Sequence, residues 1–205
     1  VHNAGGKIMP QIWHVGMARV AENAPFSELP SAGPSGFFKL FKQGAEPMTV
    51  AHIESVIEAF AQAAADAQKI GMDGVEIHGA HGYLVYQFFW EGTNQRTDSW
   101  GGSMENRGRF AVEIIKAIRE ATSPDFPIVL RYSQWKQQDY TARLAQSPQE
   151  LEQFLQPLSK AGVDIFHCSQ RRYWESEFEG SELNLAGWTK KITGKPTITV
   201  GSVGL

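Results

Sequence analysis

Short apolar runs recur along this chain at intervals that each leave room for a helix. The runs begin near residues 74, 127, 163 and 197. The similar tripeptides Gly71-Met72-Asp73 and Gly162-Val163-Asp164 each stand where a helical pattern ends and an apolar run begins. This alternation predicts successive strand and helix units with a parallel sheet. Right-handed crossovers then leave two architectures, an open doubly wound sheet or a (β/α)8 barrel.

The segments between the apolar runs carry helix signals. Apolar residues at three- and four-residue steps predict an amphipathic helix over 49–71, with Thr49 as its N-cap and Gly71 as its end. A second helix is expected over about 105–121, and a short one near 185–192. These lengths suit the crossover connections of a parallel sheet.

Prolines modify this pattern in three places. Ser147-Pro148-Gln149-Glu150 is a capping box that predicts a further helix, and Pro157 is expected to kink that helix or end it early. Residues 6–14 predict a short buried strand, although Pro10 removes one of its hydrogen-bond donors. Residues 15–47, which hold four prolines, read as a long loop.

Polar residues and a glycine stand at the carboxyl ends of the expected strands, and they favour the barrel. These residues are Gln11, His78, Arg131 and Gly201. In (β/α)8 barrels the functional residues gather at that end of several different strands. The chain contains neither the Gly-x-Gly-x-x-Gly fingerprint of dinucleotide-binding sheets nor a P-loop. We therefore predict an α/β protein with a (β/α)8 TIM barrel fold, in a single domain over residues 1–205.

Composition excludes several classes of function. The 205 residues carry a net charge of −3, which gives no basic face for nucleic acid or an anionic membrane. No apolar run approaches the roughly 18 residues that span a bilayer. The single cysteine, Cys168, cannot form an intrachain disulfide framework or a cysteine-built metal site. We expect a cytoplasmic protein.

Residues 74–83 concentrate the chemistry. An apolar strand there ends in His78, His81 and Tyr83, separated only by small residues. Three interpretations stay open: structural histidines, a metal site, or two neutral imidazole donors that face a substrate oxygen beside a tyrosine proton donor. The metal interpretation needs a third ligand from among His14, His167 and Glu76.

Other strand ends are ambiguous on their own. Gln11 and Arg131 suit either the mouth of a barrel or the binding of a polar planar ring. Gly201 and Ser202 offer unobstructed backbone amides to a phosphate, but a glycine after a strand also simply makes turns. Cys168 lies in an apolar strand and is expected to be an inert buried thiol.

Longer motifs make the pattern specific. The motif HGAHGYL and the later NQRTDSWGGSMENRGRF, together with QIWH, PIVLR and PTITVGSVG, resemble the signature of the Old Yellow Enzyme family of flavin-dependent reductases. The resemblance covers nearly the whole chain. It implies a (β/α)8 barrel with FMN at the carboxyl mouth, of which this chain supplies roughly strands 3 to 7. The motif from Arg96 to Arg107 is then expected to be structural.

The resemblance also implies roles for the strand-end residues. On the cofactor side, Gln11 matches the amide that binds the flavin pyrimidine edge, and Arg131 matches the cation that stabilises reduced flavin. Gly201 and Ser202 match part of the phosphate site. On the substrate side, the implied residues are His78 and His81 as donors to the activating oxygen, Tyr83 as the proton donor, and Trp13 as a lining residue.

The implied activity is an FMN-dependent oxidoreductase that uses NAD(P)H to reduce activated C=C bonds in small molecules such as enones and nitro compounds. The partner is then an electrophilic alkene, and a homo-oligomer is possible for such an enzyme. Because the chain matches five strands of eight, it reads as an excerpt. One alternative is therefore a non-catalytic fragment that needs another chain to complete the barrel, and another is a metal-dependent barrel hydrolase.

Overall fold

A five-stranded parallel sheet organises the protein. The computed structural model describes residues 1–20, 22, 24–39 and 42–204. The strands lie in the order β1-β4-β5-β6-β7, which is also their order along the chain. Their bounds are Gln11–Ile12 for β1, Val75–His81 for β4, Ile128–Lys136 for β5, Ile165–Ser169 for β6 and Thr197–Val200 for β7. Every pairing in this sheet is parallel, so the predicted strand and helix alternation is confirmed.

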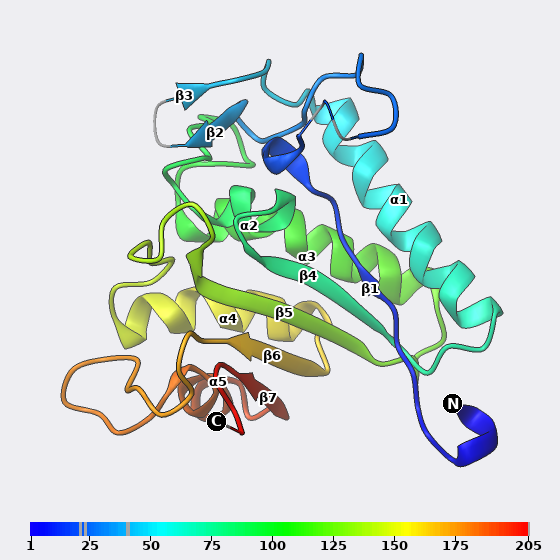
Figure 1. Cartoon of the computed structure of the whole chain (residues 1–205), viewed down its shortest axis with the longest axis vertical. Coiled ribbons are helices and arrows are strands. Elements are labelled where there is room, and N and C mark those ends of the chain that lie inside the picture. The colour runs from blue at the N-terminus through cyan, green and yellow to red at the C-terminus, as the bar shows by residue number, and fades with distance from the viewer. Residues whose placement is uncertain (21, 23, 40–41, 205) are drawn as a thin grey trace.

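Helices connect the strands, and several of them lie behind the sheet in the view of Figure 1. Their bounds are Val50–Lys69 for α1, Leu84–Phe89 for α2, Met104–Ala121 for α3, Pro148–Ala161 for α4 and Leu185–Thr193 for α5. A side-chain oxygen caps the amino end of four of them, from Thr49, Ser103, Ser147 and Asn184. Such caps accept hydrogen bonds from backbone amides that the first helical turn leaves unpaired.

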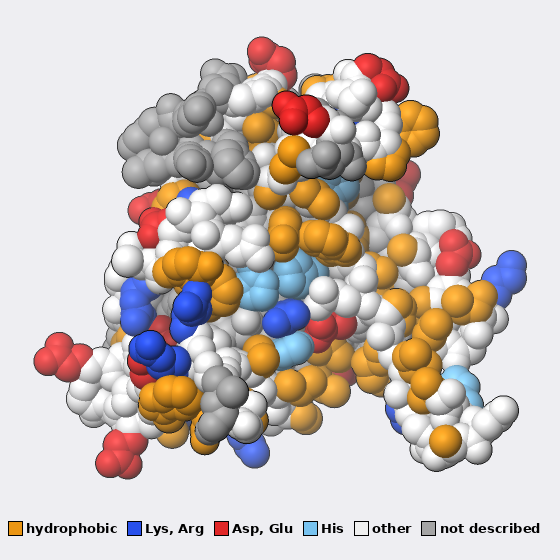
Figure 2. Space-filling view, in the orientation of Figure 1, with side chains coloured by type: hydrophobic (Ala, Val, Ile, Leu, Met, Phe, Trp, Pro, Cys, Tyr) orange, Lys and Arg blue, Asp and Glu red, His pale blue; other side chains and the backbone are white. Residues whose placement is uncertain are grey.

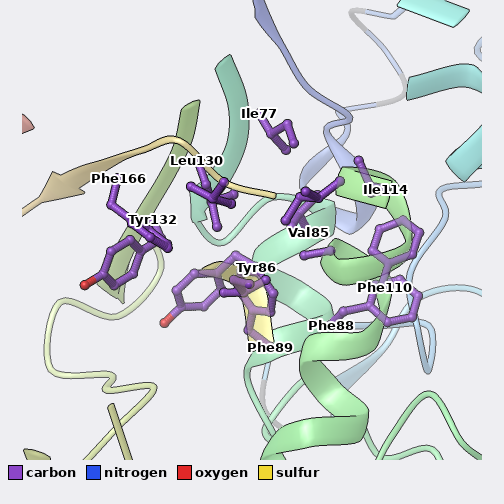
Figure 3. Close-up of a cluster of buried hydrophobic side chains, with 14 of the residues drawn as sticks. Ile77, Val85, Tyr86, Phe88, Phe89, Phe110, Ile114, Leu130, Tyr132 and Phe166 are labelled. Carbon is purple, nitrogen blue, oxygen red and sulfur yellow. The ribbon is translucent and has the colours of Figure 1, made fainter. Parts of the chain in front are cut away.

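The core fills the space between the sheet and these helices, and Figure 3 shows its centre. Ile77, Leu130 and Phe166 come from three adjacent strands and are fully buried. They pack in one cluster with helix residues that include Phe88 and Phe110, whose rings stack at 4.1 Å. Side chains alternate along a strand. The strand residues next to Ile77, Leu130 and Phe166 in sequence therefore point to the opposite, inner face of the sheet.

The 15–47 segment is not the plain loop that its prolines predict. A 3-10 turn, η2, covers Gly16–Ala18, and two short antiparallel strands follow, β2 at Phe37–Lys39 and β3 at Lys42–Gln43. The strand expected over 6–14 is also shorter, because only Gln11–Ile12 pair with β4. A further 3-10 turn, η1, covers His2–Ala4 at the amino terminus.

The sequence misjudged the end of one helix and missed another. Helix α4 passes through Pro157 and ends at Ala161, because its buried stripe holds it against the core despite a proline cost of about 3 kcal/mol. Helix α2 was not predicted at all. All six of its residues are buried, so its sequence lacks the amphipathic period that reveals a helix.

The Arg96 to Arg107 motif holds the connection before α3, as expected. Arg96 donates to the backbone oxygens of Pro34 (2.9 Å) and Met48 (2.6 Å), and it also pairs with Asp98. Arg107 donates to Phe89 O at 2.7 Å. These bonds tie the segment to distant parts of the chain, so the motif serves the fold rather than chemistry.

Candidate flavin and substrate site

The inner face of the sheet is polar. In Figure 2 histidine, basic and acidic side chains gather in the middle of this face, over the sheet of Figure 1. The strand register explains the grouping. Gln11 lies beside Glu76, His78 lies beside Arg131, and Arg131 lies beside His167. Four neighbouring strands therefore place polar side chains on one surface.

A bulge brings the two histidines together. Strict alternation would send His78 and His81, three residues apart, to opposite faces of β4. The register of β4 against β5 shifts between Gly79 and His81, and His81 has a φ of 64°. Its backbone amide donates to Ser133 Oγ at 3.0 Å, which holds this left-handed conformation. The shift therefore re-aims the His81 ring towards His78, a use of bulges that is common beside active sites.

Aromatic rings surround the histidine pair. The ring centroids of His78 and His81 lie 5.2 Å apart, and Tyr83 lies 5.3 Å from His78. Trp13 contacts both His78 (5.8 Å) and Tyr83 (4.6 Å) edge to face. Trp13 is 49% exposed, whereas His78 is 4% exposed. The structure thus assembles all four residues that the sequence assigns to the substrate side.

Both histidines are neutral at physiological pH. Burial, with the nearby Arg131 charge, lowers the pKa of His78 to about 4. Burial, with the neighbouring His78, lowers the pKa of His81 to about 3. A neutral imidazole has one N–H donor and one acceptor nitrogen, so each ring can offer a hydrogen bond without carrying charge.

The His81 ring is held on two sides. Its Nε2 lies 2.8 Å from Ser169 Oγ, and its plane stacks on Trp135 at 4.6 Å. If the Ser169 hydroxyl donates to Nε2, the imidazole proton lies on Nδ1 and is free to face a ligand. Ser169 and Trp135 also line a cavity of about 330 Å³ that continues towards Tyr140 and Arg171.

Two buried nitrogen atoms on this face have no partner among the described residues. They are His78 Nδ1 and Arg131 Nε. Buried polar atoms are rarely left without a hydrogen bond in proteins, so each points to a bound molecule. Arg131 is a fixed cation, and a flavin ring offers polar edge atoms and becomes negatively charged on reduction. The residues present therefore fit a flavin.

Gln11 belongs to a hydrogen-bonded network on the same face. Its Nε2 lies 2.5 Å from Glu76 Oε1, and His167 Nδ1 lies 2.6 Å from Glu76 Oε2. Burial raises the pKa of Glu76, but the hydrogen bonds from His167 and Gln11 outweigh it, and the pKa lies below its ordinary value. Glu76 is therefore a carboxylate at neutral pH.

Gly201 and Ser202 stand apart from the histidine pair. They follow the end of β7, and β6 separates β7 from Arg131 on β5. A Cβ at Gly201 would lie 2.1 Å from Gln170 O, and its φ is 139°, so this position requires glycine for the close approach of two backbones. Ser202 also has a left-handed φ of 58°. The structure thus gives Gly201 a role in the fold, and the phosphate role stays a prediction.

Metal ligands do not gather in the described part of the chain. No three His, Cys, Asp or Glu side chains there come together in a group that could hold a metal ion. Of the three candidate third ligands, His167 and Glu76 bond to each other, and His14 Nδ1 accepts a hydrogen bond from Gly16 N. Cys168 is buried, and burial raises the pKa of its thiol to about 12, which keeps it protonated and unreactive.

Comparison with known proteins identifies the family. A model of the NADH:flavin oxidoreductase / NADH oxidase family matches residues 1–204. The chain belongs to the NADH:flavin oxidoreductase / NADH oxidase family. The resemblance to Old Yellow Enzyme is thereby confirmed. Among the described residues, no helix of this family member is long and apolar enough to cross a membrane.

The relatives span more than this chain does. NADH oxidase of Thermoanaerobacter brockii is 37% identical over 215 residues, which cover 99% of this chain and 32% of that protein. NADPH dehydrogenase of Bacillus velezensis is 36% identical, over 98% of this chain and 56% of that protein. A structure of morphinone reductase in complex with tetrahydroNAD matches with a TM-score of 0.80 and 25% identity, over 98% and 57%. This match confirms the barrel fold, of which the five strands form a part.

Sequence reasoning missed several residues of the family member's site. Glu76 and His167 were considered only as metal ligands, although Glu76 lies two residues before His78 and so shares its face of the strand. Ser169 and Trp135 had no sequence signal, because their contacts with His81 depend on the bulge. The alternation of side chains along β4 predicts that Glu76 shares the face of His78. No local sequence pattern predicts the contacts of Ser169 and Trp135 with His81.

Proposed function

We propose that this chain carries the flavin and substrate site of an FMN-dependent oxidoreductase that uses NAD(P)H to reduce activated C=C bonds. The observation that carries the proposal is the pair of unpartnered buried nitrogens, His78 Nδ1 and Arg131 Nε, on one polar face. Family membership supports it, since a relative and a matching structure are named NADPH dehydrogenase and morphinone reductase.

Residues on the inner face would hold FMN. Gln11 offers its amide to the pyrimidine edge, Arg131 offers a permanent positive charge beside it, and Gly201 and Ser202 offer backbone amides to the phosphate. When bound, FMN would supply the hydride chemistry that links oxidation of NAD(P)H to reduction of the substrate at its β-carbon. The Arg131 charge favours the reduced state electrostatically, since it attracts the negative charge gained on reduction.

The histidine pair would hold the substrate. As neutral rings, His78 and His81 each donate a hydrogen bond to the carbonyl or nitro oxygen that activates the double bond. That oxygen gains negative charge as the reaction proceeds, so the two donors bind the transition state more strongly than the substrate. Preorganised donors of this kind lower a barrier by about 3 kcal/mol each.

Tyr83 would complete the reduction by giving a proton to the α-carbon. Its ring lies 5.3 Å from the His78 ring, and within the described part of the chain its hydroxyl makes one long contact, 3.4 Å, to Gln137 Oε1. A proton donor must reach the reacting atom without being locked in a strong bond elsewhere. Trp13 covers Tyr83 and His78 on the exposed side, where it limits the entry of water.

The substrate class follows from the same residues. Two neutral donors and a phenol suit an uncharged enone or a nitroalkene, and the relatives named above include both an NADH and an NADPH enzyme. The cytoplasmic location, a homo-oligomeric state and a single domain over 1–205 remain predictions. The comparisons do not call for the alternative of a non-catalytic fragment, and the described residues give no support to a metal-dependent hydrolase.

The experiment is an FMN-dependent turnover assay. The purified chain, reconstituted with FMN, is mixed with NADH or NADPH and 2-cyclohexenone under nitrogen, and the saturated ketone is quantified. We expect ketone only when protein, FMN and nicotinamide are all present. A chain that binds FMN but forms no saturated product from enones or nitroalkenes with either nucleotide would contradict the proposal.

A further inference from the structure

Glu76 occupies a position on the inner face that none of the proposed roles uses. It is the partly buried carboxylate between Gln11 and His167, and each of its oxygens accepts one short hydrogen bond. The side chains of Glu76 and His167 are only 16% and 17% exposed. Moving a carboxylate out of water costs free energy, even when both of its oxygens accept hydrogen bonds. A carboxylate at this position therefore suggests a specific role.

The hydrogen bond from Gln11 Nε2 to Glu76 fixes the orientation of the Gln11 side-chain amide. A carboxylate only accepts hydrogen bonds, so the Gln11 nitrogen must face Glu76 and the Gln11 carbonyl oxygen lies at the other end of the amide. Without Glu76 the amide could flip, because its two ends have nearly the same shape. Glu76 therefore decides that Gln11 presents an acceptor rather than a donor.

The charge of Glu76 acts on a second residue. Glu76 and Arg131 lie on adjacent strands, and their opposite charges attract and help to keep the Glu76 pKa low. They make no direct ion pair among the described contacts, so Arg131 Nε stays available to a ligand. The carboxylate thus offsets part of the positive field that a molecule beside Arg131 experiences.

We propose that Glu76 is a positioning residue for the flavin, which orients the Gln11 amide as an acceptor for the ring N3–H and moderates the Arg131 charge. This inference rests on the proposed function. Through Gln11, Glu76 strengthens the binding of oxidised FMN. Through Arg131, it limits how strongly the site prefers the negatively charged reduced form, and so it keeps the flavin able to reduce its substrate.

Two variants separate the two effects. Glu76→Asp keeps the charge but withdraws the carboxylate by one methylene from Gln11. It should weaken the binding of oxidised FMN by about tenfold, the scale of one charge-assisted hydrogen bond, with little change in the ratio of oxidised to reduced affinity. Glu76→Gln keeps the length but removes the charge. It should favour reduced FMN by about tenfold, which for a two-electron couple is about 30 mV towards positive potential.

The measurements are the FMN dissociation constant from fluorescence quenching and the midpoint potential by anaerobic dye titration. Glu113→Gln removes a carboxylate on α3, where Glu113 pairs with Lys116 on the outer surface, and it should leave both values unchanged. Urea unfolding checks that each variant is folded, and Glu76→Asp, the milder change, decides the matter if Glu76→Gln does not fold.

The outcomes distinguish this inference from the proposed function. A wild-type chain that binds no FMN would overturn both. A wild-type chain that binds FMN, with both Glu76 variants within twofold of it in affinity and in the oxidised-to-reduced ratio, would overturn only the role of Glu76. Equal effects of the two variants on the potential would also overturn it, because a merely structural residue would not separate length from charge.

Discussion

Removing both imidazoles at the end of β4 should damage one half of the reaction and spare the other. The variant is His78→Ala with His81→Ala. The two ring centroids are 5.2 Å apart, and both rings are neutral because their pKa values are lowered to about 4 and about 3. Each substitution therefore removes one uncharged hydrogen-bond donor. One such donor is worth about 10² to 10³ in rate. Donors that act on the same oxygen are not additive, so we expect a loss of about 10³ to 10⁴ for the pair.

The assay follows the two half-reactions separately by stopped-flow absorbance. Reduction of bound FMN by NAD(P)H is recorded first, and reoxidation of the reduced protein by 2-cyclohexenone is recorded second. The substrate oxygen is present only in the second half-reaction, so the loss should appear there. His52→Ala removes an exposed histidine near the start of α1 and is the matched control, with both rates expected within twofold of the wild type.

Two results would refute this reasoning. Equal slowing of both half-reactions would mean that the histidines hold the flavin or the fold rather than the substrate oxygen. Unchanged enone reduction in the double variant would mean that the oxygen is bound elsewhere. Urea unfolding of the variant separates either result from a general loss of structure.

Three further predictions concern stability, and urea unfolding measures each. Burial lowers the pKa of His78 from 6.5 to about 4, so the unfolded chain binds more protons between these values and stability falls as the pH drops from 6.5 to 4. His78 should account for roughly 3 kcal/mol of this loss, and His78→Gln should remove that share while the share of His81, whose pKa is also lowered, stays; a pH profile unchanged by His78→Gln would contradict the burial argument. Phe110→Ala deletes a fully buried ring stacked on Phe88 and should cost about 3 to 5 kcal/mol, whereas Ile70→Ala, at a 72% exposed position, should change stability by less than about 0.5 kcal/mol. Gly201→Ala places a Cβ 2.1 Å from Gln170 O and should cost more than about 1 kcal/mol, whereas Gly108→Ala, inside α3 with open space, should stabilise by about 0.5 to 1 kcal/mol; similar effects at both glycines would refute the close approach.

The sequence predicted those parts of the fold in which local and tertiary preferences agree. Helices α1 and α3 have a polar cap, an amphipathic stripe and a clear end, so their bounds were predicted to within a few residues. The apolar cores of β4 to β7 were found for the same reason. Both β4 and β5 run further than their apolar residues, however, because strand pairing continues through polar positions that only the folded sheet places.

The misses share a physical cause. Helix α2 is buried on all sides, α4 passes through Pro157, and His81 changes direction at a bulge. In each case contacts from distant parts of the chain override the local preference, and single-sequence patterns do not contain those contacts.

In the candidate site, too, some residues were predicted from sequence motifs and others depend on the register of the sheet. Trp13, His78, His81 and Tyr83 were grouped by motif, and the structure brings their rings together. The bonds of Glu76 to Gln11 and His167 join three strands, with Glu76 to His167 spanning 91 residues of sequence, so only the register of the sheet reveals them.

The most direct test of the central claim is a titration of the purified chain with FMN, followed by visible absorbance and flavin fluorescence. The account predicts saturable binding of one FMN per chain, with a perturbed flavin band near its usual wavelength. It further predicts that Arg131→Ala, which removes the cation whose buried Nε has no partner among the described residues, weakens binding by at least about tenfold. A chain that is folded yet leaves the FMN spectrum and fluorescence unchanged would contradict the assignment of this polar face as a flavin site.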